Sequence, residues 1–212
     1  MGNTNSDFKN AQLSSIPPEQ KLQVFGEQYC NKQPVSMTAI EQFSSFPREQ
    51  FKILDSKGEL MYKMEGLVFS TRDKKKLYDR TGHCVGAIKH KLFSARHQLN
   101  IFDNRGSRVA VVRRSGCLQF SVKVKCWIKR NGESINTHRV PDIIMTGDWR
   151  TKNLIFTNAY GQVIAKVQRR TSNLRNVLGK QTYECIVASN VDNSFIAILI
   201  VCLDEIYQHN RH

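Results

Sequence analysis

The longest apolar run in the chain lies near its carboxyl end. From Phe195 to Leu203, nine consecutive residues carry no polar group. At about 1.5 Å per helical residue, this run covers roughly half of a hydrocarbon core ~30 Å thick, so we expect it to be buried in protein. Asp192, Asn193 and Ser194 precede it and are typical N-cap residues. Its β-branched residues fit a central strand equally well, so the pattern alone leaves helix and strand open.

Four segments upstream share one pattern: an apolar strand, a polar turn that contains glycine, and a second apolar strand. Each turn begins with Asp or Asn and ends with Gly, at residues 55–58, 79–82, 103–106 and 158–161. The glycine can adopt the positive φ of a bulged hairpin, and the Asp or Asn side chain can bond to the turn backbone. The further acidic ligands of an EF-hand are missing, so we interpret these repeats as turns. They predict an antiparallel meander.

The strands in the middle of the chain alternate between apolar and basic positions. In residues 121–129, one face carries Val122, Val124, Cys126 and Ile128, and the other carries Lys123, Lys125, Trp127 and Lys129. Likewise Val85, Ala87, Lys89 and Lys91 share a face opposite Ile88, His90 and Leu92. This alternation predicts an apolar interior and a cationic exterior. We expect Trp127 to be either an ordinary surface tryptophan or a contact for lipid or bases.

A sheet that is apolar on one face only must close on itself or pack against a second layer. Further strands at residues 143–149 and 182–187 bring the expected count to about ten to twelve, enough for a barrel that holds a helix. Residues 1–47 are polar and contain Pro17, Pro18, Pro34 and Pro47, so we expect a mostly irregular N-terminal arm. The barrel domain is expected at residues 48–212, with a central helix at about 192–208.

Charge is concentrated in one stretch of this 212-residue chain. Residues 72–130 contain sixteen Lys or Arg against three Asp, which leaves +13 of the formal net charge of +14. Such a surface attracts phosphate groups of lipids or nucleic acids. The six cysteines form no C-x-x-C pair and the histidines lie at no zinc-site spacing, so we expect reduced thiols in a cytosolic protein and neither metal nor cofactor.

The first six residues, from Met1 to Ser6, match the N-myristoylation pattern with Gly2 as the acceptor. A single myristoyl chain gives an association constant on the order of 10⁴ M⁻¹, so membrane anchoring requires a second signal. The basic stretch can provide that signal.

The order of these motifs resembles the LURP-one-related (LOR) family. The resemblance rests on the Asp-x-x-Gly hairpins, Gly147-Asp148-Trp149, the segment at 178–183, and Val191-Asp192 followed by the apolar run and Asp204. That family belongs to one superfamily with tubby-like proteins and phospholipid scramblases. The resemblance spans about residues 48–208 and implies a mainly β fold, a twelve-stranded closed antiparallel barrel around a hydrophobic C-terminal α-helix. It therefore favours a helix over a strand for the apolar run.

Tubby-like domains bind a phosphoinositide on a Gly-Lys-x-Arg strand with an upstream Asn. The corresponding strand here resembles residues 85–89, with Lys89 at the Arg position, Ala87 in place of the Lys, and Lys75 or Lys76 near the Asn. Since one cation is lost and Lys lacks the bidentate geometry of Arg, the resemblance implies weaker and less selective binding.

These observations predict a non-enzymatic module at the cytoplasmic face of a membrane. We expect it to be a monomer that binds anionic phospholipid, with phosphoinositide as the expected headgroup. The predicted binding residues are Arg72, Lys74, Lys75, Lys76, Lys89, Lys91, Arg113, Arg114, Lys123 and Lys125. A membrane-tethered nucleic-acid-binding regulator with access to the nucleus, and a phospholipid scramblase, are the alternatives. Neither recognition motifs for nucleic acid nor G-x-S-x-G or phosphate-loop motifs of enzymes are present.

Overall fold

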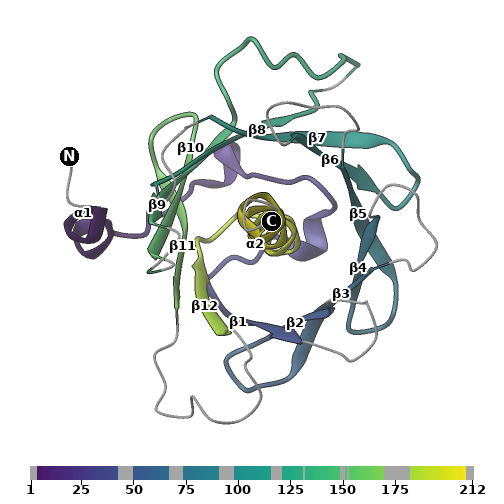
Figure 1. Ribbon diagram of the computed structural model, residues 1–212, viewed down its shortest axis with the longest axis horizontal. Helices are drawn as coiled ribbons and strands as arrows, with labels where there is room; N and C mark the ends of the chain where they lie inside the picture. The colour runs from purple at the N-terminus through teal and green to yellow at the C-terminus, as the bar shows by residue number, and fades with distance from the viewer. Residues whose placement is uncertain are drawn as a thin grey trace.

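The computed structural model describes residues 4–42, 50–66, 74–90, 98–115, 121–130, 132–148, 151, 153–169 and 182–208. Twelve strands form a closed antiparallel barrel, as predicted, and each strand pairs with its neighbours in the chain while β1 pairs with β12 (Figure 1). The strands are β1 (Val35–Gln42), β2 (Gln50–Leu54), β3 (Leu60–Gly66), β4 (Lys75–Asp79), β5 (Cys84–His90), β6 (Gln98–Asp103), β7 (Arg108–Arg114), β8 (Ser121–Ile128), β9 (Ile143–Asp148), β10 (Asn153–Asn158), β11 (Val163–Arg169) and β12 (Thr182–Val187).

The apolar run is a helix, α2 (Asn193–Gln208), and it passes through the centre of the barrel (Figure 1). Every residue of α2 from Asn193 to Tyr207 is buried. Burial of one large aliphatic side chain contributes about 1.5–3 kcal/mol, so α2 and the wall that encloses it form most of the core. No helix among the described residues is long and apolar enough to cross a membrane.

The start of α2 is fixed by the carboxylate of Asp192, which is fully buried. Its Oδ1 accepts hydrogen bonds from the backbone N–H of Phe195 (3.0 Å) and from the Ser194 hydroxyl. Its Oδ2 accepts from the backbone N–H groups of Val24 (3.1 Å) and Phe25 (2.8 Å). One side chain therefore caps the helix and holds the N-terminal segment against it, which satisfies two buried and two partly buried donors.

The barrel begins at Val35, inside the range 1–47 that is expected to form an irregular arm. Residues 35–42 form β1, which pairs with both β12 and β2. Met37 and Ala39 face the core, but the next inward position holds Glu41, which is completely buried. This polar residue interrupts the apolar alternation, so the sequence pattern does not predict a strand here.

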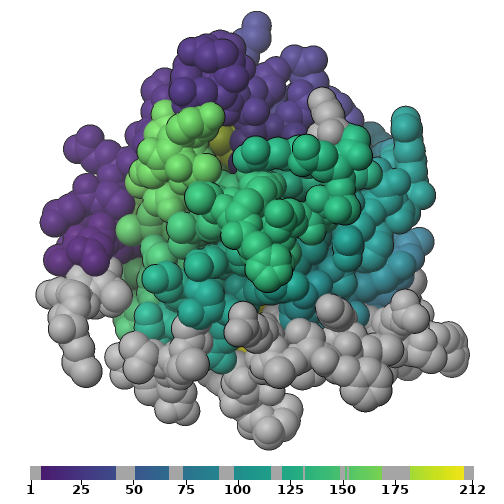
Figure 2. Space-filling view, turned by 90° about the horizontal axis from the view of Figure 1, so that it is seen from above, coloured from purple at the N-terminus to yellow at the C-terminus, as the bar shows by residue number. Residues whose placement is uncertain are grey.

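The rest of the expected arm also has a defined place. A short helix, α1 (Thr4–Asn10), lies on the outside of the barrel against β9 and β10, and two 3₁₀ turns follow, η1 (Pro18–Gln20) and η2 (Glu27–Tyr29). Segment 22–30 passes the start of α2, where Leu22 and Cys30 form isolated bridges with Val191 and Asp192. It covers one end of the barrel, as Figures 1 and 2 show in purple.

The four predicted hairpin turns are confirmed. In the first turn, Asp55 Oδ1 accepts from the backbone N–H groups of Lys57 (2.8 Å) and Glu59 (2.9 Å). Gly58 has a φ of 84°, which a residue with a side chain rarely adopts. The same contacts recur in the turns that begin at Asp79, Asp103 and Asn158.

The double role of Asp192 predicts a large loss of stability on substitution. Asp192→Ala removes the helix cap and leaves the partly buried N–H groups of Val24 and Phe25 without their acceptor. We expect the free energy of unfolding to fall by about 3 kcal/mol in urea denaturation. Asp55→Ala, in a turn exposed to solvent, is the matched control and should cost less than about 1 kcal/mol. Equal losses for the two variants would contradict the role of Asp192.

Candidate functional site

Three lysines converge on the outer wall of the barrel at β4 and β5. Lys76 pairs with Ala87 in the register of the two strands, while Lys74 directly precedes β4 and Lys89 lies near the end of β5. We refer to Lys74, Lys76 and Lys89 as the lysine cluster. All three are half-buried, and the Lys89 Nζ lies 4.4 Å from the centre of the Phe102 ring. The cluster therefore combines positive charge with partial desolvation.

The ammonium group of Lys74 is repelled by those of Lys76 and Lys89. The pKa of Lys74 is lowered from its usual value, first by burial and then by the positive charges of Lys89 and Lys76. A lowered lysine pKa shows that the protonated form is disfavoured at this place. An anion bound between these side chains would relieve the repulsion, and phosphate is an anion that lysine commonly binds.

The cationic wall extends over β2 and β3, a part that the charge count over residues 72–130 missed. Lys52 pairs with Lys63, and Lys63 pairs with Tyr78 in the adjoining strand. The Lys63 Nζ lies 5.6 Å from the Tyr78 ring and 2.8 Å from a carboxylate oxygen of Glu65. The signal was available in the sequence, because the alternation of β2 and β3 sorts these lysines to the face opposite Phe51, Ile53, Tyr62 and Met64.

A second group of cations lies on β7 and β8, where Arg113 pairs with Lys125 and Lys123 is exposed. The Arg113 guanidinium donates to Gln98 Oε1 (2.8 Å) and to the Thr137 hydroxyl (2.9 Å). Arg113 thus holds the segment before β9 against the wall. Lys123 and Lys125 lie on the outer face, as the alternation predicted.

The expectation that Trp127 lies on the surface is wrong. Trp127 does point outward, but only 6% of it is exposed. Its Nε1 donates to the carbonyl oxygen of Arg139 (2.9 Å), and the Arg139 guanidinium in turn donates to Ile128 O and to Asp142. The segment between β8 and β9 therefore covers the ring and removes it from contact with lipid or bases. Alternation reports the direction of a side chain and not what lies above it.

Two of the predicted surface cations, Lys75 and Arg114, face the barrel interior. The Lys75 ammonium pairs with the carboxylate of Glu205 in α2, and His90 Nε2 lies 3.1 Å from the other oxygen of that carboxylate. The Arg114 guanidinium lies 4.9 Å from the centre of the Tyr207 ring. Lys75 alternates with the buried Leu77, and Arg114 with Val112, so both share the core face. A charge count takes no account of strand alternation, so it assigns these two residues to the outer face instead of the interior.

The remaining predicted residues, Gly2, Arg72 and Lys91, lie outside the described residues. Within the described ranges, no cluster of three His, Cys, Asp or Glu residues is arranged to hold a metal ion. Burial raises the pKa of the Cys126, Cys185 and Cys202 thiols, and it raises that of Cys30 to about 11. These cysteines are therefore protonated and unreactive at neutral pH.

Comparison with known proteins gives one consistent family. The family model described as LURP-one-related (LOR) matches residues 35–204. The chain is 26% identical to Protein LURP-one-related 15 of Arabidopsis thaliana over 89% of this chain and 87% of the relative. It is 25% identical to Protein LURP1 of the same plant, over 89% and 91%. The X-ray structure of an Arabidopsis thaliana protein matches the fold with a TM-score of 0.65 at 23% identity, over 87% of this chain and 98% of that one.

The buried Glu205 predicts a stability difference that depends on pH. Burial alone would raise the pKa of Glu205, but the His90 hydrogen bond and the Lys75 charge lower it to about 2. A lowered carboxyl pKa contributes stability above the unfolded value, near 4.5, and this contribution is lost as the pH falls towards 2. We expect Glu205→Gln to destabilise the protein by about 3 kcal/mol at pH 7.

Denaturant titrations of both proteins at several pH values measure this difference. It should shrink steadily as the pH falls from 5 to 3. Glu65→Gln removes the exposed partner of Lys63 and serves as the control, with a small difference at every pH. A Glu205→Gln effect that stays constant between pH 7 and pH 3 would rule out the ionised pair.

Proposed function

Since the chain belongs to the LURP-one-related (LOR) family, we propose that it is a non-enzymatic module that binds anionic phospholipid at the cytoplasmic face of a membrane. The observation that carries this proposal is the lysine cluster on the outer wall of β4 and β5. The depressed pKa of Lys74 supports a place where phosphate would be stabilised. Phosphoinositides present several phosphates on one headgroup and so are the proposed lipid class.

The curvature of the barrel limits which cations can contact one flat membrane. Figure 1 shows β3, β4 and β5 on one side of the barrel and β8 on another, with β6 and β7 between them. We therefore assign the contact to the lysine cluster together with Lys52 and Lys63. Each cation near an anionic leaflet contributes about 1 kcal/mol, and Glu65 offsets the charge of Lys63, so these five side chains give about 4 kcal/mol. This amount supports reversible binding that weakens with salt.

We further propose that Gly2 carries a myristoyl chain as the second anchor. α1 begins at Thr4, two residues after Gly2, and lies against β9 and β10, across the barrel from β4 and β5 (Figure 1). Lys166 holds the end of this segment, because its Nζ donates to Ala11 O (2.7 Å) and lies 4.5 Å from the Phe8 ring centre. Simultaneous use of both anchors on one leaflet would require this short helix to leave the wall.

Charge reversal in the lysine cluster should abolish most of the lipid binding. For Lys76→Glu/Lys89→Glu, we expect sedimentation with phosphoinositide-containing vesicles to weaken at least about tenfold, because two attractions become repulsions. Binding of the unchanged protein should fall as salt rises. The matched control is Lys57→Glu/Lys129→Glu, which makes the same change in net charge at two exposed positions away from the cluster.

Two outcomes would contradict this proposal: an equal loss in the control variant, or binding that does not respond to salt. If the unchanged protein bound duplex DNA at physiological salt and ignored the vesicles, the nucleic-acid alternative would replace it. Movement of labelled lipid between leaflets in reconstituted vesicles would instead indicate a scramblase.

Acylation of Gly2 predicts a defined mass change. Protein produced in eukaryotic cells should carry one myristoyl group on Gly2 by mass spectrometry, and Gly2→Ala should lower its share in the membrane fraction. Since one acyl chain binds only marginally, Gly2→Ala combined with the lysine reversals should release more protein than either change alone. An unmodified or acetylated N-terminus in the unchanged protein would disprove this anchor.

A further inference from the structure

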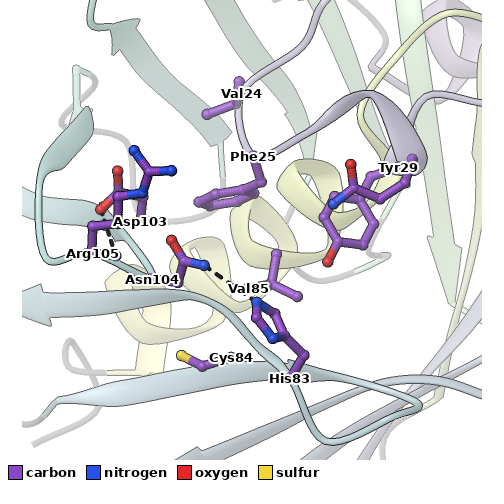
Figure 3. A pocket seen from close by; sticks show the side chains of 10 residues that line it. Val24, Phe25, Tyr29, His83, Cys84, Val85, Asp103, Asn104 and Arg105 are labelled. Atoms are coloured by element: carbon purple, nitrogen blue, oxygen red, sulfur yellow. Dashed lines mark hydrogen bonds between the residues drawn. The ribbon is translucent and has the colours of Figure 1, made fainter.

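A cavity of about 300 Å³ lies at the hairpin end of the barrel, between the N-terminal segment and the turns after β4 and β6 (Figure 3). Val24, Phe25 and Val85 supply its apolar floor, and polar residues of the two turns form its rim. It is separate from the lysine cluster, because Lys74 lies at the start of β4 whereas the turn at residues 79–83 follows the end of that strand. The two sites therefore share no residues.

The floor is held in place by the core. The backbone N–H of Phe25 donates a hydrogen bond to Asp192, which fixes the position of this residue. The Phe25 ring packs edge to face on Phe195 of α2, with 5.8 Å between the ring centres. Gly86 of β5 makes room for this ring, since a Cβ at that position would lie 2.7 Å from two ring carbons. The core thus fixes the position of the Phe25 ring at the cavity, which lowers the entropy cost of binding an apolar group against it.

The rim is positioned by the turn chemistry of two hairpins. Asp79 Oδ1 accepts the backbone N–H of His83 (3.0 Å), and Asp103 Oδ1 accepts that of Arg105 (3.0 Å). Asn104 and His83 meet across the gap, with 3.3 Å between Asn104 Nδ2 and His83 Nε2 (Figure 3). Side chains from two hairpins therefore converge on one opening.

The charges and hydrogen-bonding groups of the lining select a class of ligand. Asp103 and Arg105 carry opposite charges, so the lining favours neither an anion nor a cation. The amide side chains of Asn104 and Gln28 both donate and accept, and an imidazole such as that of His83 has two ring nitrogens that can form hydrogen bonds. Such groups match hydroxyls, which also donate and accept, while the aromatic floor matches an apolar face. A volume at the lower end of the usual range for ligand sites fits one ring.

We propose that this cavity binds a single polyhydroxylated ring, a monosaccharide or cyclitol, with one C–H face on Phe25 and its hydroxyls bonded to Asn104 and His83. The ring can arrive as a free molecule or as the headgroup of a lipid. Both sources share the same chemistry, so they are separated by experiment.

Saturation-transfer NMR with free myo-inositol and with free glucose tests the soluble source, using the full-length protein. We expect transfer to the ring protons of at least one of them and at least a fivefold weaker affinity for Asn104→Ala. The control is Ser56→Ala, the equivalent position in the turn of residues 55–58, which does not line the cavity. Equal affinity of Asn104→Ala and the unchanged protein would overturn the site.

Cys84 offers a second, independent readout because it lines the cavity and is only partly buried. A bound ring should slow alkylation of Cys84, measured by peptide mass mapping against the same protein without the ring. For the lipid source, neutral glycolipid vesicles should protect Cys84, and Lys76→Glu/Lys89→Glu should retain this protection. Absence of both NMR transfer and Cys84 protection, with free rings and with glycolipid vesicles, would refute the proposal and leave the lysine cluster untouched.

Discussion

The whole structure depends on the enclosure of an apolar helix in a closed wall. α2 has no polar face along Phe195–Leu203, so in water it is stable only when surrounded on every side. Twelve strands surround the helix, and each strand has one of its two faces directed towards the barrel interior. Side chains on the other face point away from the core, so they need not be apolar. Charge can therefore accumulate on the exterior at little cost to stability.

The division between the two faces decides the role of each cation. Lys75 and Lys76 are neighbours in the chain, yet the first pairs with Glu205 beside the helix and the second lies on the outer wall in the lysine cluster. The same holds for Arg113, outside, and Arg114, inside. In a strand, a shift of one position exchanges a core contact for a surface contact. The role of a charged residue in this chain can be assigned only once its strand and the face on which it lies are known.

Local chemistry made the hairpins and the strands predictable, since an Asp or Asn with a Gly three residues later needs no distant partner to form a turn. The helix required the family resemblance, because its residues suit a strand as well. What the sequence could not show were contacts between distant segments. Glu41 concealed β1, residues 132–142 cover Trp127, and the cavity joins residues 24–29 to two hairpins. A local sequence pattern does not predict contacts between segments that are far apart in the chain.

The pairing of β1 with β12, and of residues 22–30 with Val191 and Asp192, links segments that lie about 150 residues apart in the chain. The wall cannot close before β12 has left the ribosome, and α2 cannot be enclosed before residue 208 has done so. Until then the apolar inward faces of the other eleven strands lack β12 and α2 as partners. Exposed apolar faces of this kind make folding intermediates prone to aggregation. Such dominance of long-range contacts slows folding and prolongs the exposure of unpaired strand edges.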